Sequence, residues 1–101
     1  MDIYYQIPTP PAYQIPASGT IIYEIPAFKN VRNLLKAIYV DMVAGQTLSI
    51  QVDDNLHFMY FTGAKQGGIP FRCGVQFQTS IILTISGTAA TNFYCGVVTN
   101  Y

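Results

Sequence analysis

The side chains best suited to chemistry are few in this sequence. His57 is the only histidine, and no cysteine or second histidine stands at the short spacing that a zinc site needs. Asp53, Asp54 and Asn55 place three oxygen-bearing side chains in a row, and calcium prefers such ligands. The same residue types are the ones that a tight β-turn requires, and the spaced pattern of a calcium-binding loop is missing. We therefore interpret His57 as structural and the acidic run as a turn.

Two further segments bear on binding. The loop Gly63–Gly68 contains three glycines and Lys65, but it lacks the Gly-Lys-Ser/Thr ending of a phosphate-binding loop, so we expect flexibility there and no phosphate site. Lys29, Arg32 and Lys36 form the one basic cluster, which we interpret as a solvated face. The sequence predicts no catalytic residue, no metal site and no cofactor, and we expect a protein that is not an enzyme.

The composition indicates one domain whose surface is covered in part by other subunits. The chain has 101 residues, half of them hydrophobic, and only 10% are charged, whereas about 25% is usual. Eight tyrosines and six phenylalanines leave more apolar surface than one small domain hides, which favours a homo-oligomer. Five basic and five acidic residues cancel, so we expect no specific nucleic-acid binding.

The sequence also predicts where the chain is made. No run approaches the roughly 18 apolar residues of a membrane span, and Asp2 stands where a secretory signal carries a basic residue. We therefore expect no membrane span and synthesis in a cytoplasm. Cys73 and Cys95 each alternate with apolar residues, so we expect two small buried side chains. A disulfide bond between them is geometrically possible if their strands are neighbours, but a reducing compartment argues against it.

Period-two alternation of apolar and polar residues predicts β-strands over most of the chain. It is clearest in 80–86, where Ile81, Leu83 and Ile85 share one side, and in 91–97, and we interpret these two runs as a closing hairpin around the polar turn 87–90. Further strands are expected over 20–25, 47–52, 56–62 and 69–78. Residues 34–43 match both a helical stripe and a β-rich run, and we favour the strand.

Seven strands at regular spacing predict an all-β fold, and among sandwiches and small barrels we choose a single jelly roll over residues 20–101. Residues 1–19 carry most of the prolines and the recurring tetrads Tyr5-Gln6-Ile7-Pro8 and Tyr13-Gln14-Ile15-Pro16. Proline excludes a central strand, so we expect an extended Pro/Tyr-rich arm. Its aromatic and aliphatic side chains need a surface, which belongs either to a neighbouring subunit or to the arm's own domain.

Three stretches are similar to one kind of protein: the Gly/Thr-rich opening that leads to Ile25, the strand pair that ends in Ala44-Gly45-Gln46-Thr47, and the closing run 83–94 (LTISGTAATNFY). Over about residues 19–100 the chain resembles small single jelly-roll structural virion proteins of icosahedral bacteriophages, of the penton, minor capsid or decoration type. The resemblance implies a homo-oligomer, often a pentamer or trimer, that is built into a virion together with other capsid proteins. No functional residue is carried over from it.

From the residues we infer an assembly interface on the arm and on the aromatic strand 56–62. Its predicted members are Tyr4, Tyr5, Ile7, Tyr13, Ile15, Phe58, Tyr60 and Phe61. Aromatic side chains of this kind supply much of the binding energy at protein interfaces. The alternative is a carbohydrate- or receptor-binding β-sandwich, in which tyrosine and asparagine residues on loop tips stack on sugar rings.

Overall fold

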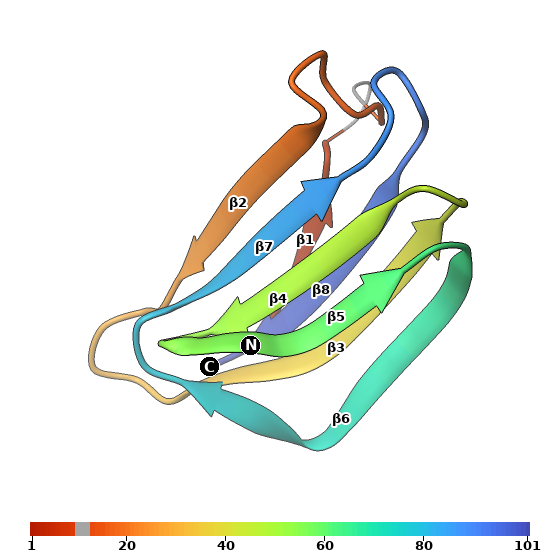
Figure 1. Cartoon of the computed structure of the whole chain (residues 1–101). Helices are drawn as coiled ribbons and strands as arrows, with labels where there is room; N and C mark the ends of the chain where they lie inside the picture. Colours follow the sequence, from red (N-terminus) through yellow and green to blue (C-terminus); the bar gives the residue numbers. More distant parts are fainter. Residues whose placement is uncertain (10–12) are drawn as a thin grey trace.

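The protein is a sandwich of two four-stranded antiparallel sheets, seen face to face in the computed structural model (Figure 1). The structure describes residues 1–9 and 13–101, and for residues 55–57 it describes the backbone alone. Within this part of the chain no helix occurs. The strands are β1 (Asp2–Ile7), β2 (Thr20–Pro26), β3 (Asn33–Met42), β4 (Thr47–Val52), β5 (Asn55–Thr62), β6 (Lys65–Phe77), β7 (Ser80–Ser86) and β8 (Tyr94–Asn100).

The strand order follows a simple rule. One sheet has the order β1-β8-β3-β6 and the other β2-β7-β4-β5. The first four strands pair with the last four in reverse order, as β1 with β8, β2 with β7, β3 with β6 and β4 with β5. The chain is thus one long antiparallel ribbon folded over into two layers. Its ends meet, because the amino group of Met1 donates a 2.8 Å hydrogen bond to the carbonyl of Tyr101.

The core lies between the sheets and is built from the alternating residues that the sequence indicates. Ile81, Leu83 and Ile85 of β7 are fully buried, and so are Cys95 and Val97 of β8. The inward sides of β3 and β4 add Leu35, Ile38, Val40, Met42, Leu48, Ile50 and Val52 to the same cluster. Removal of this apolar surface from water is the main term that stabilises the two layers against each other. Burial of Cys95 also raises the pKa of its thiol to about 12.

Two predictions about pairing have different outcomes. Residues 33–42 form the strand β3, so the β-rich interpretation of this segment is confirmed over the helical one. The predicted hairpin of 80–86 with 91–97 is wrong, because β7 and β8 belong to different sheets. Alternation identifies the buried side of a strand, but strands in both layers of a sandwich show the same pattern. It therefore cannot identify the partner strand.

The separation of an N-terminal arm from the sandwich is not found in the structure. Asp2–Ile7 is the strand β1, which pairs with β8 over its whole length, so the described part of the chain has eight strands rather than seven. Ile7 and Ile15 are each 2% exposed and belong to the core. Pro8 follows the strand directly, consistent with the confinement of proline to strand ends and edges. Of the predicted arm, residues 10–12 lie outside the described part.

β6 corrects two further expectations. It begins at Lys65, so most of the predicted flexible loop Gly63–Gly68 is strand. Its pairing with β3 jumps from Leu35↔Val75 to Ala37↔Pro70, which leaves four residues of β6 opposite one of β3. Gly74 in this bulge has a φ of 75°, a conformation that favours glycine. The bulge changes the facing of the side chains, so Cys73 is exposed and free instead of buried.

The turn between β4 and β5 confirms the interpretation of the acidic run as a turn. The Asp53 carboxylate accepts backbone hydrogen bonds from Gln78 at 3.0 Å, Thr79 at 2.8 Å and Ser80 at 3.3 Å. It thereby ties this hairpin to the connection between β6 and β7. Burial opposes ionisation of Asp53, but the three N–H donors outweigh it and hold the pKa of the carboxyl below its ordinary value of 3.8.

We expect Asp53→Asn to lower the free energy of unfolding at pH 7 by about 1–3 kcal/mol, because the amide accepts fewer of these hydrogen bonds. Asparagine keeps the left-handed backbone that Asp53 adopts, with a φ of 53°. Since the folded pKa is depressed, the contribution of Asp53 is present above the ordinary carboxyl pKa and is lost as the pH falls through the folded value. Urea denaturation should show the gap between wild type and variant narrowing on acidification. Asp54→Asn, at an exposed neighbour, should leave stability unchanged at pH 7.

Candidate functional site

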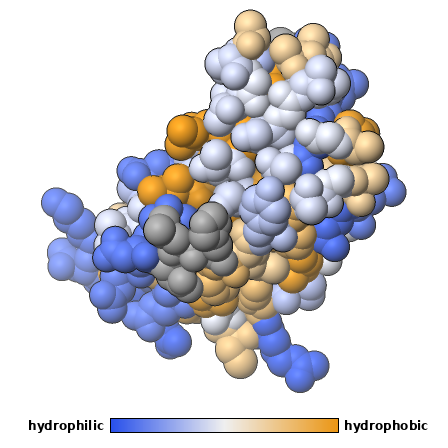
Figure 2. Space-filling model, in the orientation of Figure 1, coloured by the Kyte–Doolittle hydropathy of each residue, from blue (hydrophilic) through white to orange (hydrophobic). Residues whose placement is uncertain are grey.

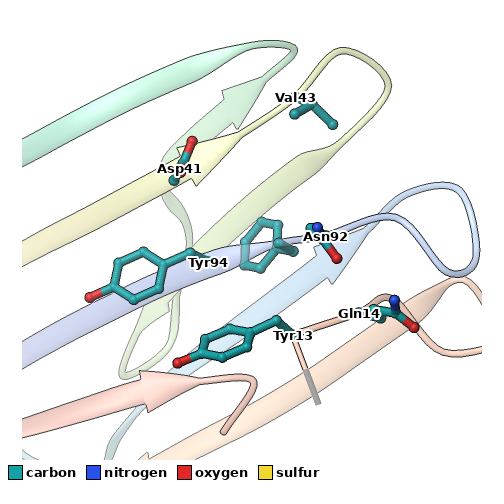
Figure 3. A pocket seen from close by; sticks show the side chains of 7 residues that line it. Tyr13, Gln14, Asp41, Val43, Asn92 and Tyr94 are labelled. Atoms are coloured by element: carbon teal, nitrogen blue, oxygen red, sulfur yellow. The ribbon is translucent and has the colours of Figure 1, made fainter. Parts of the chain in front are cut away.

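A hollow of about 690 Å³ opens at the end of the sandwich where β3 ends and β8 begins (Figure 3). We call it the tyrosine groove. It is lined by Tyr13, Gln14, Asp41, Val43, Asn92, Phe93 and Tyr94. Its volume lies within the range of small-molecule sites, which is roughly 300–1,000 Å³.

The segment that follows β1 brings Tyr13 and Gln14 to the groove. Its backbone pairs with the stretch before β8, since Phe93 donates to the carbonyl of Tyr13 at 2.9 Å and Ile15 donates to that of Thr91 at 3.0 Å. Gln14 and Asn92 form an isolated antiparallel bridge in the same ladder. Ile15 anchors the segment because its side chain is buried in the core. The groove is therefore built on paired backbone and not on free loops.

The two tyrosine rings of the groove are fixed at their hydroxyl ends. The amide of Gln6 donates to the Tyr13 hydroxyl at 2.6 Å, and the hydroxyls of Tyr4 and Tyr94 share a hydrogen bond. Figure 3 shows the rings of Tyr13 and Tyr94 side by side, with their hydroxyls pointing the same way. Side chains that are held in place before a ligand arrives lose less conformational entropy on binding.

Gly96 makes room for this arrangement. A Cβ at this position would lie 2.5 Å from the Tyr4 hydroxyl oxygen and 2.8 Å from a carbon of the same ring. Tyr4 can therefore lie across β8 only because residue 96 has no side chain, and this places its hydroxyl beside that of Tyr94. Glycine in a strand often marks such a close approach.

The polar side chains of the groove can form hydrogen bonds with a ligand. Asp41, on β3 directly opposite Tyr94, is a hydrogen-bond acceptor, while Gln14 and Asn92 each offer a donor and an acceptor. Asp41 is the one charged residue of the lining. In the described part of the chain, no three side chains of the types His, Cys, Asp and Glu gather as a metal site. The side chain of His57 lies outside the described part.

Gln46 supports the rim of the groove from inside. Its side chain is 1% exposed, accepts from the backbone N–H of Val43 at 3.0 Å, and donates to the carbonyl of Asn92 at 2.7 Å and the hydroxyl of Thr91 at 3.1 Å. One buried amide thus joins the β3–β4 connection to the β7–β8 connection. Buried polar groups need such partners, because an unsatisfied one is costly.

The structure separates the eight side chains predicted for an assembly interface. Tyr4 and Tyr13 lie at the groove, and Tyr5 is half-buried at the edge of the sandwich, where burial raises the pKa of its phenol. Ile7 and Ile15 are in the core. The β5 residues lie in the other sheet: Tyr60 is exposed, Phe61 is half-buried beneath the Lys65 ammonium, and Phe58 is half-buried against Phe71. Only Tyr4 and Tyr60 among the eight are exposed, and they are on opposite layers.

Sequence reasoning missed Gln14, Asp41, Asn92 and Tyr94 as members of one site. The period-two pattern of β8 already places Tyr94 opposite the buried side that contains Phe93 and Cys95, so an outward aromatic residue could have been noticed. Nothing local indicates that Asp41 stands beside it. The two residues are more than fifty positions apart, and they meet only because β3 pairs with β8.

The opposite layer presents a second surface, which we call the neutral face. It consists of the outward residues of β2-β7-β4-β5: Thr20, Ile22, Glu24, Ile82, Thr84, Ser86, Thr47, Ser49, Gln51, Tyr60 and Thr62. A direct row of partners, Ile22–Thr84–Ser49–Tyr60, crosses the whole sheet. Figure 2 looks onto this layer and shows mainly pale residues of intermediate hydropathy along it. Glu24 is the one charged residue among these eleven described side chains.

In the described part of the chain, no helix is both long and apolar enough to cross a membrane. Lys29 and Arg32 of the basic cluster are exposed on the connection before β3, and Lys36 is half-buried in that strand. Comparisons of the chain with protein-family models, with characterised proteins and with solved structures found no match.

Proposed function

We propose that this chain is a structural virion protein, a capsid, minor capsid or decoration subunit that works as a homo-oligomer beside other capsid proteins. It would be made in the cytoplasm of a host and end in the virion. We assign no catalytic step to the protein. The observation that carries the proposal is the neutral face, a sheet surface with large exposed apolar residues and almost no charge.

The strand pairing supports a jelly roll as the finer description of the sandwich. The eight strands pair first with last, second with seventh and so on, and they alternate between the two sheets except at the β4–β5 hairpin. This is the arrangement that two Greek keys of a jelly roll produce. Jelly rolls serve in viral capsids and in lectins. The fold is thus compatible with a virion role. Because one fold serves many functions, the evidence for this role comes from the surface.

The neutral face supports self-association. Ile22 is 70% exposed and Tyr60 56% exposed, at the two ends of the row that crosses the sheet. These two large side chains supply apolar area that a contact with another subunit would remove from water. Because the chain has no net charge, a second copy meets no net electrostatic repulsion. Hydroxyl and amide side chains between the two apolar ends can hydrogen-bond to an equivalent face.

We expect the wild-type chain to form a closed oligomer, and the double variant Ile22→Lys/Tyr60→Lys to weaken it at least about tenfold in dissociation constant, because two charges would be buried in the contact. The measurement is molar mass by light scattering over a dilution series. Val31→Lys is the matched control, since Val31 is a 46% exposed apolar residue outside the face, and it should leave the mass unchanged.

A wild-type chain that stays monomeric at about 100 µM would contradict self-association through this face. An oligomer that persists in the double variant would show that the contact between subunits lies on another surface. Negative-stain microscopy of the oligomer then examines the virion role, for which rings or shells of defined symmetry are expected.

A further inference from the structure

The tyrosine groove lies on the layer opposite the neutral face. It combines aromatic rings with polar side chains, as a ligand site does. Tyr13 and Tyr94 are half-buried, and their rings lie side by side as a platform rather than facing each other across a cage (Figure 3). Tyr13 accepts a hydrogen bond from Gln6, and Tyr94 shares one with Tyr4. A flat ligand with an apolar side can pack on such a platform without reorganising it.

The polar side chains around the platform are available to a ligand. Asp41, Gln14 and Asn92 are exposed, and none of their side chains makes a hydrogen bond to the described part of the chain. Asp41 contributes carboxylate acceptors, and the two amides contribute donors and acceptors. Together they suit a ligand whose edge carries several groups that both donate and accept, as adjacent hydroxyls do.

Charge narrows the ligand class. Asp41 is the one charged residue of the lining, so phosphates, nucleic acids and acidic sugars meet repulsion instead of a partner. A quaternary ammonium ion would be attracted to Asp41, but it is recognised best inside an aromatic cage, and the two rings do not form one. A neutral ring with one apolar side and hydroxyls on its edge fits both the platform and the polar rim.

We propose that the tyrosine groove binds a neutral hexose unit of a glycan. The sugar ring packs its C–H side on Tyr13 and Tyr94. Adjacent hydroxyls donate to the Asp41 carboxylate, and the amides of Gln14 and Asn92 bind the remaining hydroxyls. This inference does not depend on the proposed virion role, and it gives the carbohydrate-binding alternative a defined place on the molecule.

The test is a titration of the full-length, ¹⁵N-labelled chain with the methyl glycosides of glucose, galactose and mannose, followed by amide chemical shifts. We expect at least one glycoside to bind with a dissociation constant on the order of 1 mM, as befits a single sugar in an open groove. The shifts should centre on Tyr13, Gln14 and residues 92–94. Choline and the methyl glycoside of N-acetylneuraminic acid serve as the cationic and anionic comparisons.

Two variants make the test specific. Tyr94→Leu should weaken binding at least about tenfold because the platform is lost, and Asp41→Asn by about three- to tenfold because a carboxylate acceptor is lost. Tyr39→Leu is the control: Tyr39 is a tyrosine of the same layer, 43% exposed, and it does not line the groove. If Tyr94→Leu fails to fold, as judged from its amide spectrum, Asp41→Asn decides.

Several results would overturn the inference: no shifts with any of the three glycosides at about 50 mM, shifts centred outside the groove, binding that Asp41→Asn leaves unchanged, or binding of choline alone. The outcome is separate from that of the assembly experiment. Ile22→Lys/Tyr60→Lys changes the other layer, so it should leave glycoside binding intact.

Discussion

A chain that begins at Ala17 will not fold. It lacks β1, whose backbone pairs with β8 from Asp2↔Asn100 to Ile7↔Cys95, and it lacks the buried side chains of Ile7 and Ile15. Each of these isoleucines contributes about 1.5–3 kcal/mol by burial alone, and the edge of β8 would be left unpaired. The two burial terms together, about 3–6 kcal/mol, are comparable with the lower end of the roughly 5–15 kcal/mol stability of a small domain, and the loss of the β1–β8 pairing adds to them. Loss of amide shift dispersion and of a cooperative urea transition would show it.

Single substitutions measure how much the buried side chains of the N-terminal segment contribute to stability. Ile15→Ala should lower the free energy of unfolding by about 2–5 kcal/mol, because it leaves a cavity in the core. Val31→Ala, at a 46% exposed valine outside the neutral face, should change it by less than about 0.5 kcal/mol. A folded chain from Ala17, or an Ile15→Ala variant as stable as Val31→Ala, would mean that the N-terminal segment is an arm after all, free to lie on a neighbouring subunit.

Gln46→Ala is expected to lower the free energy of unfolding by about 2–4 kcal/mol. The substitution removes three hydrogen bonds and leaves the N–H of Val43 and the carbonyl of Asn92 without their partner. It also leaves an empty space beside Gly87, whose position would bring a Cβ to 3.0 Å from the Gln46 side chain. Chemical denaturation at neutral pH measures the loss.

The effect of Gln46→Ala should also be local. Gln46 links the β3–β4 connection to the β7–β8 connection by its hydrogen bonds. Amide hydrogen exchange in the variant should therefore rise first around Val43 and residues 88–93, next to the tyrosine groove. Gln66→Ala, at an exposed glutamine of β6, is the matched control and should be neutral. Equal stability of the two variants would show that the buried amide is replaceable by solvent.

Local patterns settled the class of this fold. Strict alternation in residues 47–52 and 80–86 produces one apolar side per strand, and such strands are stable only when two sheets bury those sides against each other. The turn at Asp53 and Asp54 was predictable for an equally local reason, since these side chains satisfy backbone donors at a chain reversal. Strand 34–43 was the harder case, because its apolar residues fit two periodicities.

The tertiary structure decided the partners. The same alternation occurs in both layers, so nothing in β7 or β8 forbids the hairpin that the structure does not contain. Prolines suggested an arm, but Pro8 only ends β1 and leaves the preceding six residues free to pair with β8. Cys73 was misplaced because a bulge of several residues in β6 changes which side chains face inward.

By itself, then, the sequence determined an all-β chain of low charge whose alternating strands must bury one side each, because these are properties of neighbouring residues and of composition. Which strands lie side by side depends on contacts between residues far apart in the chain. The pairing of β3 with β8, and of residues 13–15 with residues 90–93, decides that Asp41, Tyr13 and Tyr94 share one groove. Pairing across such separations is selected by the packing of the whole core, and no local pattern encodes it.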